Sequence, residues 1–321
     1  MSAVDGASSG ASEPGPVTAF LEGLESQFSR VERFRDTVDP AAAREGRRIV
    51  KEFLTPRVPE LRAAAGLPSG RGRVAHGRRL AAADGGRVGS DELPVYCYWD
   101  TGVDAAPELV RACMDRLQQV HPDARLLDAT GIHELIAVPE RVTAVLAEDH
   151  KAHYADYLRV ALLEKYGGIW VDATCWLPGP LHRSILTYLD AGVVYPRWTH
   201  REIGNWFIAS VPGSLIITLQ RLALEMWWEE RSDVPDYFLY HRVFETLHEL
   251  IPEFRGQWSR VPSLSSTASH LLQLSMMQPW FPGVADIMAR LSIVQKLSYK
   301  YDPESVPEGS ILARLLEHGA L

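Results

Sequence analysis

The feature that most constrains this chain is residues 151–181, where a helical pattern runs through two glycines straight into a short apolar segment. Apolar side chains recur every three or four residues up to Tyr166, which predicts a helix. Gly167 and Gly168 follow, and glycine readily adopts the positive φ at which helices end. Residues 169–171 are all apolar, as in a strand that is covered on both faces. The segment therefore predicts a helix that turns at once into a buried strand.

An acid, Asp172, stands where this apolar run ends. Because side chains alternate along an extended chain, Asp172 and Thr174 project to one side while Ala173 points to the other. In an open α/β sheet, the carboxyl ends of the strands border the crevice where ligands bind. We therefore expect two oxygen ligands to face one crevice.

The residues before this segment have the order strand, helix, strand. The apolar and aromatic run PVYCYW, which begins at Pro94, predicts a buried strand. Helical spacing follows over 106–120, and a second strand is predicted over 124–127. Strands joined by a helix of this length pair in parallel, with helices packed on the sheet. We therefore expect an α/β sandwich with a mostly parallel central sheet.

The chain before this sheet has a different composition. Residues 1–16 are mainly Ser, Gly, Ala and Pro with scattered acids, which predicts a disordered tail. Residues 17–60 predict an α-helical N-terminal extension with a break near Pro40. Residues 61–92 are rich in Gly and Arg and predict a flexible linker. The α/β domain is expected over 93–321.

Charge and composition exclude several classes of function. The formal net charge of −8, from 33 Lys and Arg against 41 Asp and Glu, repels phosphate backbones, so no nucleic-acid partner is expected. No apolar run approaches the ~18 residues that span a bilayer, and the first residues lack the features of a secretion signal. We therefore expect a cytoplasmic protein without a transmembrane segment. The local signatures of dinucleotide binding, the P-loop and zinc proteolysis (GxGxxG, GxxxxGK[ST] and HExxH) do not occur.

Asp156 and Arg159 lie three residues apart in the predicted helix and share a face. One interpretation is a local ion pair worth ~0.2–0.5 kcal/mol. The other is that both side chains turn into the crevice, where the acid accepts hydrogen bonds from hydroxyl groups and the guanidinium meets phosphate oxygens in a planar fork. The sequence leaves both interpretations open.

Four motifs together resemble a known family. The run DYLRVALLEKYGGIWVDATCW (156–176) is followed by IGNWFIAS (203–210), DYFLYHRVF (236–244) and KLSYK (296–300). This combination resembles glycosyltransferase family 32, the capsular-polysaccharide-synthesis and mannosyltransferase-like enzymes. The resemblance covers roughly 94–300 and excludes the N-terminal extension.

The resemblance implies a GT-A-like nucleotide-binding fold that takes a UDP- or GDP-sugar donor and transfers the sugar with retention. It also implies that Trp99, at the end of the first strand, stacks near the nucleotide base. Asp156 and Arg159 match the residues that bind the donor sugar and diphosphate, and we expect Gly168 beside them.

The resemblance further implies a bound Mn²⁺ or Mg²⁺, because the family's metal-binding D-x-D falls on Asp172, Ala173 and Thr174. The second acid of that motif is here Thr174, a neutral hydroxyl, whereas hard divalent cations favour carboxylates. Asp172 and Thr174 are the predicted metal ligands, in a weakened motif.

A leaving diphosphate gains negative charge, which a cation must stabilise. Arg159, Lys296 and Lys300 are candidate direct cations, beside a metal on Asp172. The alternative for the two lysines is a solvated strand end.

The remaining candidates come from the two middle motifs. Asn205 and Trp206 open a predicted strand and are expected to reach donor or acceptor, although core packing is the alternative for Trp206. Asp236 and His241 lie in a segment rich in Tyr and Phe, which suits a sugar, whereas a satisfied helix histidine is the alternative for His241. With Asp172, we predict Asn205, Asp236 and His241 as catalytic.

These patterns favour a glycosyltransferase that acts on a hydroxyl of a polysaccharide intermediate or a small metabolite. The alternative is a degenerate transferase domain that binds a nucleotide or glycan without turnover, and Thr174 is the reason to consider it.

Overall fold

The computed structural model describes residues 15, 17–23, 39–68, 93–181, 185–319 and 321. The predicted disordered tail, apart from one residue, and the predicted linker from residue 69 onward lie outside these residues. The helical extension is described over 17–23 and from residue 39 onward.

The central sheet has five strands in the order β2-β1-β3-β7-β5. The strands are β1 (Val95–Tyr98), β2 (Arg125–Leu127), β3 (Gly168–Val171), β5 (Val193–Val194) and β7 (Phe207–Ser210). β1 pairs in parallel with both β2 and β3, whereas β7 is antiparallel to both of its neighbours. Within this sheet only β7 therefore runs against the others, and the expected mostly parallel α/β sandwich is confirmed.

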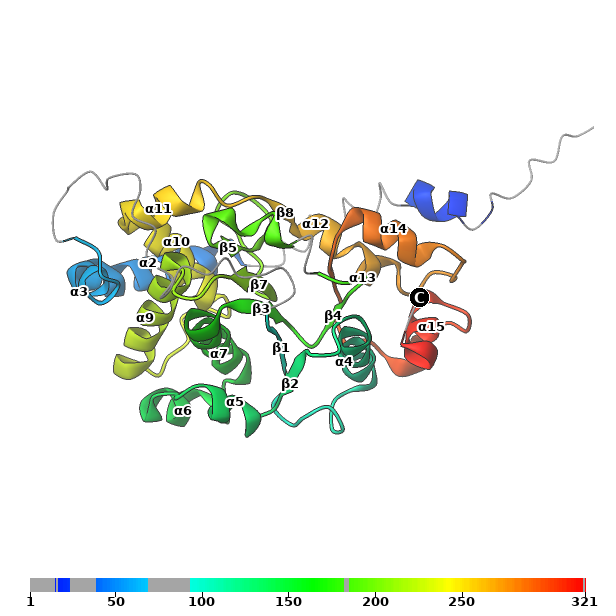
Figure 1. The fold of residues 1–321 in the computed structure, drawn as a ribbon, viewed down its shortest axis with the longest axis horizontal. Coiled ribbons are helices and arrows are strands. Elements are labelled where there is room, and N and C mark those ends of the chain that lie inside the picture. The colour runs from blue at the N-terminus through cyan, green and yellow to red at the C-terminus, as the bar shows by residue number, and fades with distance from the viewer. Residues whose placement is uncertain (1–14, 16, 24–38, 69–92, 182–184, 320) are drawn as a thin grey trace, which may run out of the picture.

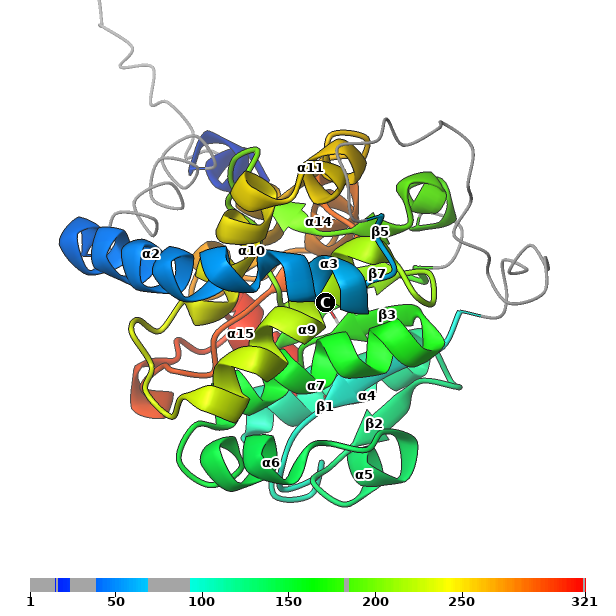
Figure 2. The ribbon, with the colours of Figure 1, turned by 90° about the vertical axis from the view of Figure 1, so that its left-hand side faces the viewer.

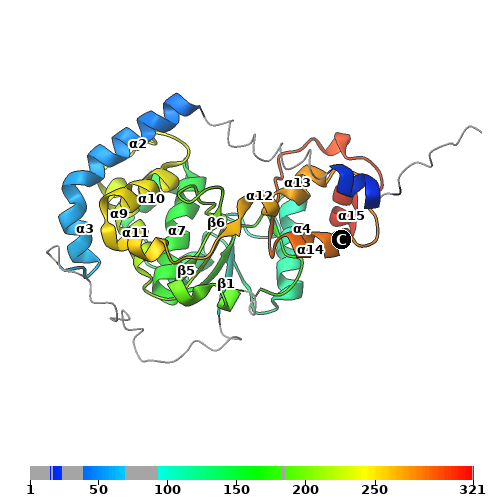
Figure 3. The same cartoon turned by 90° about the horizontal axis from the view of Figure 1, so that it is seen from above.

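Alternation along the strands divides the interior into two cores, one on each face of the sheet. Tyr96 and Trp170 face a core with α7 (Lys151–Tyr166), α9 (Leu215–Glu230) and α10 (Leu239–Leu250). Cys97 and Ile169 face a second core with α4 (Glu108–Val120). The sheet accordingly lies between two groups of helices (Figure 1, Figure 3).

Local sequence explains the junction of α7 with β3. Gly167 ends α7 at φ 65°, and Gly168 begins β3 at φ 103°. A Cβ atom on Gly168 would lie well inside contact distance of the carbonyl oxygen of Pro94. Only glycine therefore lets β3 approach the start of β1 this closely.

The N-terminal extension packs against the helices of the main domain. α2 (Pro40–Leu54) begins after Asp39, whose side chain caps it, and α3 (Val58–Ala64) follows. α2 lies against α10 and α3 lies against α9 (Figure 2), and Val50 and Leu61 are fully buried in the same core as Trp170. The extension is thus joined to the α/β domain by apolar packing.

Two small sheets pair segments that follow β3 with segments nearer the C-terminus. A two-stranded sheet joins β4 (Cys175–Trp176) to β9 (Gln295–Lys296) in antiparallel register, and another joins β6 (Pro196–Arg197) to β8 (Leu264–Ser265). Among the described residues, helical residues 17–23 aside, the other α-helices are α5 (Gly131–Leu135), α6 (Glu140–Leu146), α11 (Pro252–Trp258), α12 (Ser266–Ser269), α13 (Leu271–Ser275), α14 (Val284–Leu291) and α15 (Ile311–His318). In the described part of the chain, no helix has the length and apolar character to cross a bilayer.

Candidate active site

Asp172 lies at the carboxyl end of β3, as the sequence predicts. Its main-chain N–H donates to the carbonyl of Trp206 at 2.8 Å, which ties the end of β3 to the residue before β7. Its carboxylate Oδ1 accepts a hydrogen bond from Trp170 Nε1 at 2.9 Å. Sequence reasoning missed Trp170 as a site residue, although the alternation of side chains along a strand places it on the same face as Asp172.

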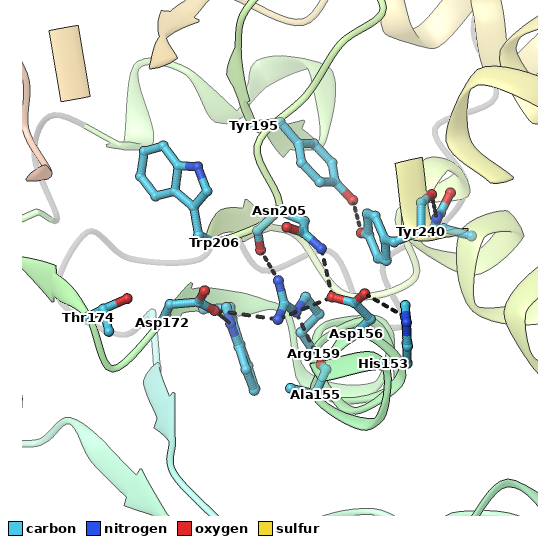
Figure 4. A network of polar contacts seen from close by, with 12 residues as sticks. His153, Ala155, Asp156, Arg159, Asp172, Thr174, Tyr195, Asn205, Trp206 and Tyr240 are labelled. Carbon is cyan, nitrogen blue, oxygen red and sulfur yellow. Dashed lines mark hydrogen bonds and ion pairs between the residues drawn. The ribbon is translucent and has the colours of Figure 1, made fainter. Parts of the chain in front are cut away.

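Arg159 is the centre of a buried network (Figure 4). Its side chain is 5% exposed, and its Nη2 lies 3.3 Å from Asp156 Oδ1 and 3.4 Å from Asp172 Oδ1. Nε donates to the carbonyl of Ala155 at 3.1 Å, and Nη1 donates to the carbonyl of Asn205. The local ion pair and the turn toward the strand end therefore occur together. The guanidinium is therefore already surrounded by acceptor groups of the protein.

Asn205 contacts both Asp156 and Arg159. Its side-chain Nδ2 donates to Asp156 Oδ1 at 2.7 Å, while its carbonyl accepts from Arg159. His153 approaches the other oxygen of Asp156, with 3.7 Å between Nδ1 and Oδ2. The predicted donor-binding residues on α7 and the predicted catalytic Asn205 thus belong to one connected group.

Lys296 reaches the same carboxylate from the opposite side. Its Nζ lies 3.1 Å from Asp172 Oδ2 and donates to Thr174 Oγ1 at 2.5 Å. The pairing of β4 with β9, which sets Cys175 opposite Lys296, holds the side chain there. We call Asp156, Arg159, Asp172 and Lys296 the charged cluster.

The cluster fixes the charge state of Asp172. Burial alone would raise the pKa of this carboxyl, but Lys296 and Arg159 outweigh burial and hold the pKa below its ordinary value. Burial likewise works against the charged form of Lys296, and Asp172 reverses the effect, so the lysine pKa is raised. The cluster therefore contains an ionised carboxylate between two cations.

The donor set at Asp172 and Thr174 does not fit a divalent cation. The described residues contain no group of three or more Asp, Glu, His or Cys side chains that could hold one. Asp172 Oδ1 already accepts from Trp170, and the ammonium of Lys296 binds both Asp172 Oδ2 and the Thr174 hydroxyl. A hard cation needs several free oxygen ligands, whereas here the ammonium of Lys296 already binds the oxygen atoms of Asp172 and Thr174.

Trp99 lies beside the KLSYK motif. It follows β1, and its main-chain N–H donates to the carbonyl of Leu127 at 3.0 Å. Its ring meets that of Tyr299 edge-to-face, with centroids 5.6 Å apart. Lys300 is exposed, next to this aromatic pair. The end of β1 therefore lies against the C-terminal motif, and contact of Trp99 with a base stays a prediction.

Two predicted residues have structural explanations. Trp206 is 7% exposed and lies in the second core, where its ring meets His270 edge-to-face. Core packing is therefore favoured for the ring, while the carbonyl of Trp206 accepts from the N–H of Asp172. Gly168 stands at the other end of β3 from Asp172, and its contact with Pro94 accounts for it.

Asp236 and His241 are not brought into the charged cluster by any hydrogen bond or ion pair of the described residues. Asp236 precedes α10, accepts from the main-chain N–H of Phe238 and pairs with Arg242 Nε at 2.7 Å. His241 lies in α10 against Phe238 and Tyr240, with its Nδ1 buried and unpaired. Burial lowers the pKa of His241 to about 4, so this imidazole is neutral at pH 7.

Comparison with known proteins gives a family for the chain. A solved structure titled "PaToxG Glycosyltransferase" is similar at 11% identity and a TM-score of 0.37, covering 72% of this chain and 87% of that chain. No curated protein gives a significant match. The model of a family described as "Capsular polysaccharide synthesis protein" matches residues 86–315. This match spans more than half of the sequence, and the chain belongs to the capsular polysaccharide synthesis protein family.

Proposed function

We propose that this protein is a glycosyltransferase that moves a sugar from a UDP- or GDP-sugar to a hydroxyl group of an acceptor. The observation that carries the proposal is the charged cluster, in which Lys296 and Arg159 flank Asp172 at the carboxyl end of β3. This edge is where α/β sheets bind ligands, and Trp99 borders it with an aromatic ring. Membership of a family described by polysaccharide synthesis supports the same reaction.

The reaction needs what the cluster offers. The bond between the anomeric carbon of the donor and its β-phosphate oxygen breaks, and the electron pair stays on the diphosphate. The acceptor oxygen bonds to the anomeric carbon and passes its proton to the leaving diphosphate. A fixed cation beside the phosphate lowers the barrier because negative charge develops on the leaving group. We assign this electrostatic part to the cluster and propose transfer with retention, as the family resemblance implies.

We place the acceptor on the side of the cluster nearest His153. Tyr237 lies there with its ring 6.0 Å from that of His153, and it is 69% exposed. An exposed aromatic ring close to Asp156 suits a sugar, since the ring covers apolar faces of the pyranose and the carboxylate accepts from its hydroxyl groups. A glycan intermediate of polysaccharide synthesis fits this surface and the family. A small metabolite is the second acceptor class.

The test is incubation of the full chain with UDP- and GDP-sugars, with mass spectrometry to follow release of the nucleoside diphosphate. We expect slow donor hydrolysis with water as acceptor, accelerated by the correct sugar acceptor. The Asp172→Asn variant is the internal control and should lose at least ~10²-fold in rate. Tight nucleotide binding with no release of diphosphate from any donor would instead favour the non-catalytic binding protein.

The expected cytoplasmic location stays a prediction.

A further inference from the structure

Resting on the proposed function, we infer that the ammonium of Lys296, rather than a divalent cation, neutralises the diphosphate of the donor. Lys296 Nζ lies between Asp172 Oδ2 and Thr174 Oγ1, the two oxygen atoms that the sequence predicts as metal ligands. One positive charge of the protein thus stands where the family resemblance implies a metal ion.

Lys296 is the more exposed cation of the cluster and has a donor left for a ligand. An ammonium carries three N–H donors, and Asp172 and Thr174 use two of them. Its side chain is 21% exposed, against 5% for Arg159, whose guanidinium donates to two carbonyl groups and forms ion pairs with two carboxylates. A phosphate oxygen can therefore be bound by Lys296 without breaking the network around Arg159.

The position of Lys296 is fixed before any ligand arrives. The main-chain N–H of Leu297 donates to the Thr174 carbonyl at 2.9 Å, which extends the pairing of β4 with β9. Gln295 on the other side is fully buried, and its Oε1 accepts from the N–H of Leu272 at 3.2 Å. A cation held in this way needs little reorganisation when charge develops on the leaving group.

A divalent ion would meet two obstacles at this place. Its charge would be repelled by Lys296 and Arg159, which both lie within 3.4 Å of Asp172. It would also have to displace the lysine to reach Asp172 Oδ2, and would gain from Thr174 only a neutral hydroxyl. With the lysine in this role, the electron pair of the broken bond stays on a diphosphate that is already paired with the Lys296 ammonium. The transfer consumes no further reactant.

The experiment measures binding of UDP and GDP to the full chain by calorimetry, in EDTA and then in Mn²⁺. We expect the wild type to bind one of the two nucleotides in EDTA, with an affinity that Mn²⁺ changes less than about threefold. Lys296→Met should lose about 10- to 100-fold in affinity under both conditions, the scale of a hydrogen bond to a charged group. Lys165→Met, which removes an exposed lysine bonded to the Leu135 carbonyl, is the matched control and should bind as wild type does.

The outcomes separate this inference from the proposed function. Binding that requires Mn²⁺ would overturn the role of Lys296 and leave the glycosyltransferase in place. Binding of neither nucleotide under either condition would overturn both. If Lys296→Met does not fold, as judged by thermal melting, Lys296→Arg takes its place: retained binding in EDTA supports the inference, and binding restored only by Mn²⁺ overturns it.

Discussion

Replacing Arg159 by lysine tests whether the guanidinium holds the cluster together. The substitution keeps the charge, but one ammonium cannot reach Asp156, Asp172 and the Asn205 carbonyl together. Ala155 is a helical residue whose carbonyl keeps a main-chain partner, so we count only two lost acceptors, the Asn205 carbonyl and one carboxylate. At about 1–3 kcal/mol for each buried group left unpaired, the free energy of unfolding should fall by about 2–6 kcal/mol.

The assay is equilibrium unfolding in urea with linear extrapolation, on wild type and variant at one pH. Arg48→Lys is the control, because Arg48 pairs with Glu45 and Glu52 on the surface of α2 and is 54% exposed. Exposed pairs of this kind are worth little, so the control should stay within about 0.5 kcal/mol of wild type. If Arg159→Lys is equally silent while nucleotide affinity collapses, the reasoning is refuted, and direct binding of phosphate by Arg159 is restored.

Three further outcomes are expected. Trp99→Ala should weaken nucleotide binding by about 1–3 kcal/mol in calorimetry, as for the loss of a base-stacking ring, and unchanged affinity would assign the ring to packing. Gly168→Ala should cost about 3 kcal/mol or more in urea unfolding because its Cβ would collide with Pro94 at positive φ, whereas Gly179→Ala, which has open space, should be near neutral. Burial lowers the pKa of His270 to about 4, so between pH 6.5 and 4 the unfolded chain binds a proton that the folded chain does not. From pH 7 to pH 5 the wild type should therefore lose about 2 kcal/mol more stability than His270→Asn, and equal losses would contradict the assignment.

The part of the fold that could be predicted from sequence is the part set by local patterns. Sequence patterns predicted the helix that ends at Tyr166, the turn at Gly167 and the buried strand before Asp172. They could do so because periodicity and the conformational freedom of glycine act over a few residues. A helix start at Pro40 agrees with the predicted division near this residue, since an acid before a proline is a typical helix start.

The part that could not be predicted depends on long-range pairing or on very short elements. Lys296 meets Asp172 across 124 residues through two strands of two residues each, too short to show an alternating pattern. Asp236 was grouped with the sugar-binding candidates by its aromatic neighbours. In the structure its carboxylate accepts from the main-chain N–H of Phe238, a turn at the start of a helix, and pairs with Arg242, while its catalytic role stays a prediction.

Thr174, which the sequence marks as a defect in a metal motif, suits the lysine whose ammonium donates to its hydroxyl. Two carboxylates around one ammonium would leave that group with net negative charge, which repels a diphosphate. A hydroxyl accepts a hydrogen bond from Lys296 and orients it without cancelling its charge. Asp172 then serves as a shared counter-ion, fixed by Arg159 from one side and presenting Lys296 on the other. The hydroxyl at Thr174 and the lysine at the end of β9 therefore fit together as parts of one site whose cation the protein supplies.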